Sequence, residues 1–180
     1  MSTVIKSSLP SVEQIWAWLR EVPDPEIPVI SVVDLGVVRE VAWQDGDECV
    51  VTVTPTYSGC PATEVINQQI REHLCSHGLQ RVHLQTRLAP AWTTDWLTLQ
   101  GRARLHSYGI APPVGLVADG WVDTGLRTCK AGERDPHTKI TCPRCGSTDT
   151  ELVSAFGSTP CKSLHRCIAC REPFDYFKCH

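Results

Sequence analysis

Residues 49–61 read CVVTVTPTYSGCP, and this stretch decides how the larger part of the chain folds. Its first half is rich in valine and threonine, which is typical of a strand, and the predicted range is Cys49–Thr54. Proline and glycine then end the strand. The tripeptide Gly59-Cys60-Pro61 marks the start of a helix, because proline suits a first-turn position. The sequence therefore predicts a strand, a short loop and a helix, with Cys60 at the helix start.

The segments on either side predict the rest of this domain. Val37–Trp43 forms a second strand, joined to the first by the turn Asp45-Gly46-Asp47. One helix is expected to begin at Ser11, which can cap its first turn, another covers 94–108, and an alternating strand covers 82–88. The order αββαβα indicates an α+β fold with helices packed on one mixed sheet. The predicted buried face of the central helix consists of Ala62, Val65, Ile66, Ile70 and Leu74.

Composition divides the chain into three parts. Residues 111–141 contain repeated proline and glycine, and we interpret them as a linker with one short strand near Trp121. This linker separates the α+β domain, residues 1–110, from residues 142–180. The last part is too short to bury a core by itself, so it needs a metal or another crosslink.

The ten cysteines are concentrated in the last third of the chain. Residues 1–10 lack the apolar stretch of an export signal, and no apolar run is long enough to cross a bilayer, so we expect a cytoplasmic protein without membrane contact. Disulfides are rare in that compartment, and clustered cysteines there indicate metal ligands. The net charge of −3, with acidic and basic residues mixed, argues against nucleic acid as a partner.

Two Cys-x-x-Cys motifs give the most specific signal in the sequence. They are Cys142-Pro-Arg-Cys145 and Cys167-Ile-Ala-Cys170. Each motif offers two thiolates to one ion, and two motifs complete a tetrahedral site. Residues 150–156 and 162–167 are predicted to form a hairpin between them, so Cys142, Cys145, Cys167 and Cys170 would be the ligands of a metal ribbon. The alternative is a set of free buried thiols.

Two further cysteines leave the ligand set open. Cys161 and Cys179 could be bystanders, or either could replace a cysteine of the two motifs. Six thiols would also suffice for an iron–sulfur cluster, which likewise takes four cysteines. Zinc is the better match to a ribbon, and an iron–sulfur cluster is the alternative.

Cys60 and two acidic residues are the candidates in the first domain. A sulfur atom at a helix start faces unpaired amides and the positive end of the helix dipole, and both lower the pKa of a thiol. The alternative is that Cys60 packs as a small hydrophobic residue. Asp24 and Glu26, on a proline-stiffened loop, could bind a metal or hold a partner, or could form an ordinary turn. Asp34 is expected to cap a turn in which Gly36 supplies a positive φ.

The sequence lacks the motifs of an oxygenase or a dinucleotide-binding reductase. No Gly-x-Gly-x-x-Gly occurs, and no Glu-x-x-His pair of the kind that binds two irons in helical bundles. His73 and His77 are four residues apart on the central helix, but the sequence shows no third ligand for them. We therefore do not expect this chain to be an enzyme.

Three motifs in the first domain resemble those of the SufT-like iron–sulfur assembly family. They are Asp24-Pro25-Glu26, VDLGVV at 33–38 and TPTYSGCP at 54–61, in the order in which the family has them. The resemblance covers about residues 10–110. It implies that Cys60 handles a transient iron–sulfur cluster or iron, with Asp24 and Glu26 near it.

The C-terminal part resembles a second family. FGSTPCK at 156–162, CIACREPFD at 167–175 and FKC at 177–179 are similar to PaaD, the D component of bacterial phenylacetyl-CoA 1,2-epoxidase. In that system other subunits carry the di-iron oxygenase and the reductase. The resemblance implies an accessory factor of phenylacetate catabolism whose partners are the oxygenase or reductase subunits.

The sequence thus predicts a maturation factor that assists iron or iron–sulfur assembly through Cys60, with a metal ribbon for docking. Two functions from other classes are the alternatives. One is a structural or interaction subunit of the oxygenase complex, in which Cys60 has no chemistry. The other is a thiol oxidoreductase that uses a Cys-x-x-Cys pair. A homo-oligomer is compatible with each of these functions.

Overall fold

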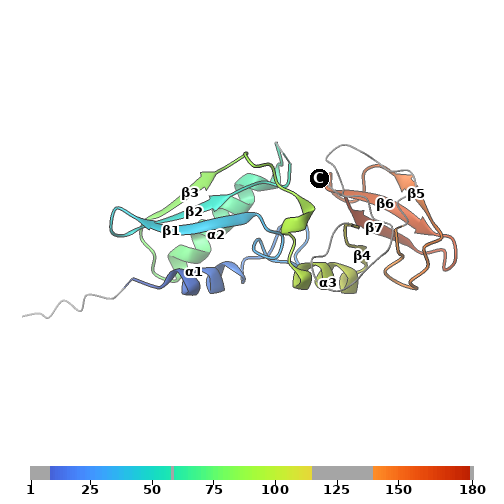
Figure 1. Cartoon of the computed structure of the whole chain (residues 1–180), viewed down its shortest axis with the longest axis horizontal. Helices are drawn as coiled ribbons and strands as arrows, with labels where there is room; N and C mark the ends of the chain where they lie inside the picture. The colour runs from blue at the N-terminus through green and yellow to red at the C-terminus, as the bar shows by residue number, and fades with distance from the viewer. Residues whose placement is uncertain (1–8, 58, 115–139, 179–180) are drawn as a thin grey trace, which may run out of the picture.

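The computed structural model describes residues 9–57, 59–114 and 140–178. Two sheets occupy opposite ends of an elongated molecule, and helix α3 (Leu99–Tyr108) lies between them (Figure 1). The first sheet contains β1 (Val38–Gln44), β2 (Glu48–Val53) and β3 (Val82–Thr86). The second contains β4 (Ile110–Ala111), β7 (Pro173–Phe177), β6 (Lys162–Cys167) and β5 (Thr150–Ser154). The predicted α+β class, with a small C-terminal cysteine-rich unit, is confirmed.

The first sheet is mixed, as predicted. Its central strand β2 pairs antiparallel with β1 and parallel with β3, so that Val51 lies opposite Val41 on one side and Leu84 on the other. The parallel pairing requires a crossover, which helix α2 (Ala62–Ser76) provides. Strand β2 is buried over almost its whole length, as the valine-rich sequence predicts for a central strand.

Helices α1 (Val12–Leu19) and α2 pack against each other and against this sheet. Ser11 caps α1 as predicted, because its Oγ accepts a hydrogen bond from the Gln14 amide at 3.2 Å. The buried stripe of α2 recurs every four residues, at Ala62, Ile66, Ile70 and Leu74. Val65 lies one position off that stripe and is 45% exposed, so its predicted burial is wrong.

Two predicted elements differ from the observed ones: a strand is shorter than expected, and a helix is divided in two. Strand β3 stops at Thr86, and Leu88 is 59% exposed. The neighbouring strand β2 ends at Val53, whose carbonyl accepts the last hydrogen bond between the two strands, from the Arg87 amide. No residue of β2 therefore lies opposite Leu88. The predicted helix over 94–108 is divided into η1 (Thr94–Trp96) and α3, because Thr98 is extended and caps α3. The predicted end of this helix at residue 109 is confirmed.

The carboxylate of Asp34 holds α3 to the loop that precedes β1. It is 6% exposed, accepts a hydrogen bond from Thr98 Oγ1 at 3.0 Å, and lies 2.8 Å from Arg104 Nη1. The Asp34 amide donates to Ser31 Oγ at 3.0 Å, and its carbonyl accepts from the Thr98 amide at 2.9 Å. The predicted turn around Asp34 is therefore present, and it also anchors the start of a distant helix.

The ribbon consists of the predicted hairpin, β5 and β6, with β7 as a third antiparallel strand. Strand β4 pairs parallel with β7, so the segment that follows α3 completes the sheet of the ribbon. Ala111 accordingly packs with Ile140 and Phe174 in the second core. The predicted strand near Trp121 lies outside the described residues. Among those that are described, no helix is long and apolar enough to cross a membrane.

We predict that Gly36→Ala destabilises the first domain strongly. Gly36 has φ +73°, and a Cβ there would lie 2.5 Å from the Trp96 carbonyl oxygen. The variant should lose about 2–4 kcal/mol in free energy of unfolding, from backbone strain plus the clash. Gly78→Ala is the control, because Gly78 has φ +95° but a Cβ there would meet no atom within 4 Å. It should lose only about 1 kcal/mol. Equal losses in denaturant titrations would contradict this close packing.

Candidate functional site

The four cysteines of the two motifs come together at one end of the ribbon. Cys142 and Cys145 lie in the loop before β5, Cys167 ends β6, and Cys170 lies in the turn before β7. Their sulfur atoms are all within 4.8 Å of one another, with Cys142 to Cys170 at 3.8 Å and Cys145 to Cys167 at 3.5 Å. A tetrahedral zinc with bonds of about 2.3 Å requires sulfur atoms about 3.8 Å apart. The donor set and its spacing therefore suit one tetrahedral ion.

The backbone around the two motifs is alike. The amide of Gly146 donates to the Cys142 carbonyl at 2.9 Å, and the amide of Arg171 donates to the Cys167 carbonyl at the same distance. Gly146 and Arg171, each one residue after a motif, both have positive φ, at 74° and 65°. Each motif thus forms the same tight turn. The backbone amide of Cys170 lowers the pKa of the Cys167 thiol to about 7, whereas the pKa values of the Cys145 and Cys170 thiols are raised.

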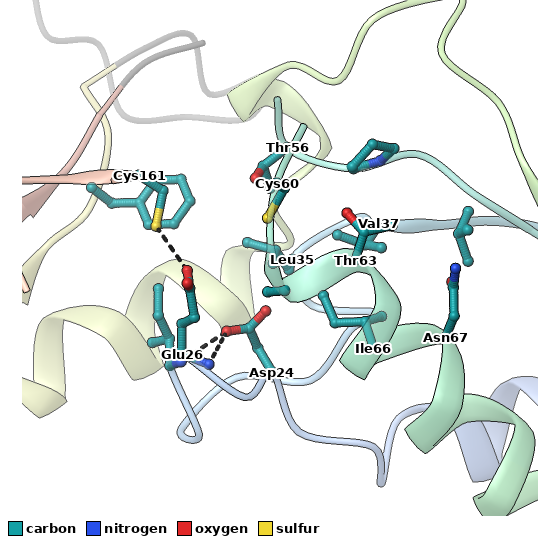
Figure 2. Close-up of a pocket in the computed structure, with 15 residues that line it drawn as sticks. Asp24, Glu26, Leu35, Val37, Thr56, Cys60, Thr63, Ile66, Asn67 and Cys161 are labelled. Carbon is teal, nitrogen blue, oxygen red and sulfur yellow. Dashed lines mark hydrogen bonds between the residues drawn. The ribbon is translucent and has the colours of Figure 1, made fainter. Parts of the chain in front are cut away.

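A second cluster lies in a pocket between the first domain and the ribbon. Asp24 and Glu26 come from the loop between α1 and β1, Cys60 from the segment just before α2, and Cys161 from the residue before β6. The cavity has a volume of about 20 Å³, and both carboxylates and both sulfur atoms face it (Figure 2). The structure thus brings together the three predicted residues of the first domain and adds Cys161.

Asp24 shapes the loop that presents Glu26. It is 5% exposed, and its Oδ1 accepts hydrogen bonds from the amides of Glu26 at 2.9 Å and Ile27 at 2.8 Å. Burial raises the pKa of this carboxyl above its ordinary value. The turn that the sequence allowed is therefore present, and it directs the Glu26 side chain toward the pocket.

Cys161 lies apart from the four-cysteine cluster. Its thiol donates toward Glu26 Oε2 at 3.8 Å, and Thr159 Oγ1 lies 3.0 Å from the same sulfur. The residue is buried, and burial raises the pKa of its thiol to about 11. The four motif cysteines are close together without it. Cys179, the other additional ligand considered, lies outside the described residues.

Cys60 lies at the start of α2, as the sequence predicts. Its carbonyl accepts from the Thr63 amide at 3.1 Å, and Pro61 is the N-cap residue, which offers no side-chain cap. Cys60 is half-buried. Burial, and then a hydrogen bond with Cys60, raise the pKa of the Tyr57 phenol to about 12. By contrast, Cys49 is fully buried in the core, and Cys75 is exposed on α2.

The structure places a carboxylate, Glu21, beside His73 and His77, for which the sequence shows no third ligand. Glu21, just after α1, places Oε2 3.4 Å from His73 Nε2, and the ligand atoms of Glu21, His73 and His77 lie within 4.8 Å of one another. Trp18 stacks on the His77 ring at 4.4 Å. Because Glu21 and His77 are exposed, the group contributes little as an ion pair, and we interpret it as a surface contact between α1 and α2.

We predict that Asp24→Ala and Asp24→Asn differ in stability. Alanine removes the acceptor of two amides and should cost about 1–3 kcal/mol in free energy of unfolding, whereas asparagine keeps an acceptor oxygen. Because burial raises the pKa of Asp24, its contribution to stability is present below its ordinary pKa and is lost as the pH rises through the raised one. Asp24→Asn should therefore gain stability relative to wild type as the pH rises above the ordinary pKa of an aspartate. Denaturation curves measured at several pH values test this. If the difference in free energy of unfolding between Asp24→Asn and wild type did not change with pH, the raised pKa of Asp24 would be wrong.

Two family models match the chain. Residues 12–81 match the model described as an iron-sulfur cluster assembly protein. Residues 127–178 match the model described as the PaaD zinc beta ribbon domain. The first match contains Asp24, Glu26 and Cys60, and the second contains Cys161 and the four clustered cysteines.

Two solved structures are similar to part of the chain. One is the crystal structure of a DUF59 domain from Bacillus anthracis, which is 24% identical, covers 52% of this chain and 89% of that chain, and has a TM-score of 0.48. The other is a conserved hypothetical protein from Thermotoga maritima, which is 25% identical, covers 55% of this chain and 97% of that chain, and has a TM-score of 0.47.

Two curated relatives cover different shares of the chain. An "Fe-S protein maturation auxiliary factor" of Porphyromonas gingivalis is 34% identical over 98 residues, which are 54% of this chain and 92% of that protein. A protein of Escherichia coli K12, described as the putative D component of 1,2-phenylacetyl-CoA epoxidase, is 51% identical over 170 residues, which are 94% of each chain. With this identity over nearly its whole length, the chain belongs to the PaaD family of phenylacetyl-CoA epoxidase components.

Proposed function

We propose that this protein is a cytoplasmic accessory factor of a phenylacetyl-CoA epoxidase system that assists iron or iron–sulfur assembly in the oxygenase or reductase subunits. The observation that carries the proposal is the convergence of Cys60, Asp24 and Glu26 on one pocket. That pocket lies largely in the domain that matches the iron-sulfur assembly family. The names of the two curated relatives, an epoxidase component and a maturation factor, point the same way.

The donors of the pocket suit an iron that is held for a short time. A stable iron–sulfur cluster takes four cysteine ligands, and the first domain offers the pocket one thiol, Cys60, with the carboxylates of Asp24 and Glu26. Because Cys60 is half-buried, iron can reach its sulfur without unfolding of the domain. An incomplete donor set leaves positions that a client protein can fill, so the cargo can be passed on.

In the same proposal, the four clustered cysteines hold one structural zinc ion. The support is the spacing of their sulfur atoms and a closed set of four thiols, which is typical of structural zinc. The sheet of β5, β6 and β7 is small, and metal binding would supply folding free energy that its core lacks. This metal has no part in the handling of iron beyond holding the ribbon together.

We expect Cys145→Ser and Cys170→Ser to release the metal and to make residues 140–178 sensitive to protease, because each variant removes one of four ligands. Elemental analysis and limited proteolysis of the full chain measure both effects, and Cys75→Ser, at an exposed position on α2, is the control. A colourless wild-type protein with one zinc would support zinc, and visible absorbance would indicate an iron–sulfur cluster. Full metal retention in both variants would refute this ligand set.

We expect cells that lack this protein to make the epoxidase subunits with less iron or cluster than wild type. A gene with Cys60→Ala should produce folded protein, because a half-buried side chain next to a helix start contributes little to stability. It should nevertheless fail to restore growth on phenylacetate, whereas Cys75→Ala should restore it. The metal content of the purified oxygenase and reductase is the measurement. Fully metallated, active subunits in the absence of this protein would favour a structural subunit instead.

A further inference from the structure

A second group of potential metal ligands lies on the first domain, at the end of α2 that is opposite to Cys60. It consists of Glu21, His73 and His77, whose ligand atoms, one from each side chain, lie within 4.8 Å of one another. The two histidines are four residues apart and therefore share one side of α2, and Glu21 comes just after α1. As an ion pair the group contributes little to stability. Its composition, two imidazoles and one carboxylate, is however that of a metal site.

The spacing of the first two ligand atoms fits a single ion. Nε2 of His73 lies 3.4 Å from Oε2 of Glu21. Two atoms that are each about 2.1 Å from a tetrahedral ion lie about 3.4 Å apart. The ring of His77 stacks on Trp18, with 4.4 Å between the ring centroids and 6° between the planes, and this contact keeps it beside the last turn of α1. Because the His77 side chain is exposed, it can bring its nitrogen to the ion by rotation about its side-chain bonds.

Nε2 of His73 lacks the polar partner that a buried nitrogen needs. The atom is buried, and among the described residues it makes no hydrogen bond, although the Glu21 carboxylate is 3.4 Å away. A buried polar atom without a hydrogen bond is costly. A cation between this nitrogen and the carboxylate would satisfy both atoms, because each can donate an electron pair to it.

The surroundings of the three ligands favour a positive charge. His77 is the C-cap residue of α2, and Glu21 follows Arg20, the C-cap residue of α1. The C-terminal ends of both helices therefore meet at this place, and each carries the negative partial charge of its helix dipole. A bound cation would interact favourably with both helix ends as well as with the carboxylate.

We propose that Glu21, His73 and His77 bind one divalent first-row transition metal ion and thereby join the ends of α1 and α2. Imidazole and carboxylate together suit ions such as Zn²⁺, whereas Ca²⁺ and Mg²⁺ prefer oxygen ligands alone. Three protein ligands leave at least one position for water, and two of the three residues are exposed. This ion therefore exchanges with solvent, unlike an ion enclosed by four thiols. The site does not rest on the function proposed above, because it involves neither the pocket nor the ribbon.

Cobalt(II) tests the site, because its absorption spectrum reports which atoms bind it. The full chain without an affinity tag, with zinc in the ribbon, is titrated with cobalt near neutral pH. Wild type should bind one cobalt beside its zinc, with weak visible bands and without the strong near-ultraviolet band that cobalt–sulfur bonds produce. His73→Ala, His77→Ala and Glu21→Ala should each weaken this binding by about tenfold or more, because each removes one of three ligands. His106→Ala is the matched control, since His106 is also an exposed histidine in the last turn of a helix.

Thermal unfolding separates a lost ligand from a lost fold. Cobalt should raise the Tm of wild type and of His106→Ala, and should leave that of the three ligand variants nearly unchanged, because the ion binds only the folded chain. Without cobalt, His77→Ala and Glu21→Ala should unfold close to the wild-type Tm, since both side chains are exposed. Wild-type cobalt affinity in these two variants would overturn the site. A wild-type protein that binds no cobalt beside its zinc would do the same, as would a cobalt–sulfur band with the zinc retained, which would identify a cysteine as the ligand.

Discussion

The buried carboxylate of Asp34 is the contact on which the arrangement of the two domains depends. Its bonds to Thr98 and Arg104 fix the start and the middle of α3 against the loop before β1. Loss of one partner of a buried charge leaves that charge uncompensated, which is costly even where the pair itself adds little. Because β4 follows α3 directly and pairs with β7, the position of α3 also sets that of the ribbon. Cys161 reaches the pocket as a result.

The two carboxylates of the acidic loop have different roles although they are two residues apart. Asp24 Oδ1 is engaged with two backbone amides, so this residue determines the shape of the loop. Glu26 makes its contact with Cys161, 135 residues further along the chain. A similar division separates the cysteines. Four lie in a closed set that suits one permanent ion, and Cys60 and Cys161 line a separate pocket.

Local patterns in the sequence were sufficient for most elements and for the four-cysteine cluster. The strand–helix junction at Cys60 and the hairpin of the ribbon depend on neighbouring residues, so composition and spacing reveal them. The exposed position of Val65 and the end of β3 before Leu88 depend on which strand or helix lies opposite, and no local pattern contains that information. The contact of Cys161 with Glu26 could not be predicted for the same reason, because the two residues are 135 positions apart in the sequence. From the sequence, Cys161 could be a bystander or a ribbon ligand, and its place beside Glu26 depends on how the ribbon packs on the first domain.

The placement of Cys161 and Phe177 in the ribbon makes the core of the first domain depend on how the ribbon folds. If zinc holds the ribbon together, a bacterium short of zinc would produce chains in which the wall that carries Cys161 is unfolded. Such chains would also lose Cys161 and Phe177 from the core cluster of the first domain. In the proposed role, growth on an aromatic carbon source that needs the epoxidase would then be limited by zinc nutrition.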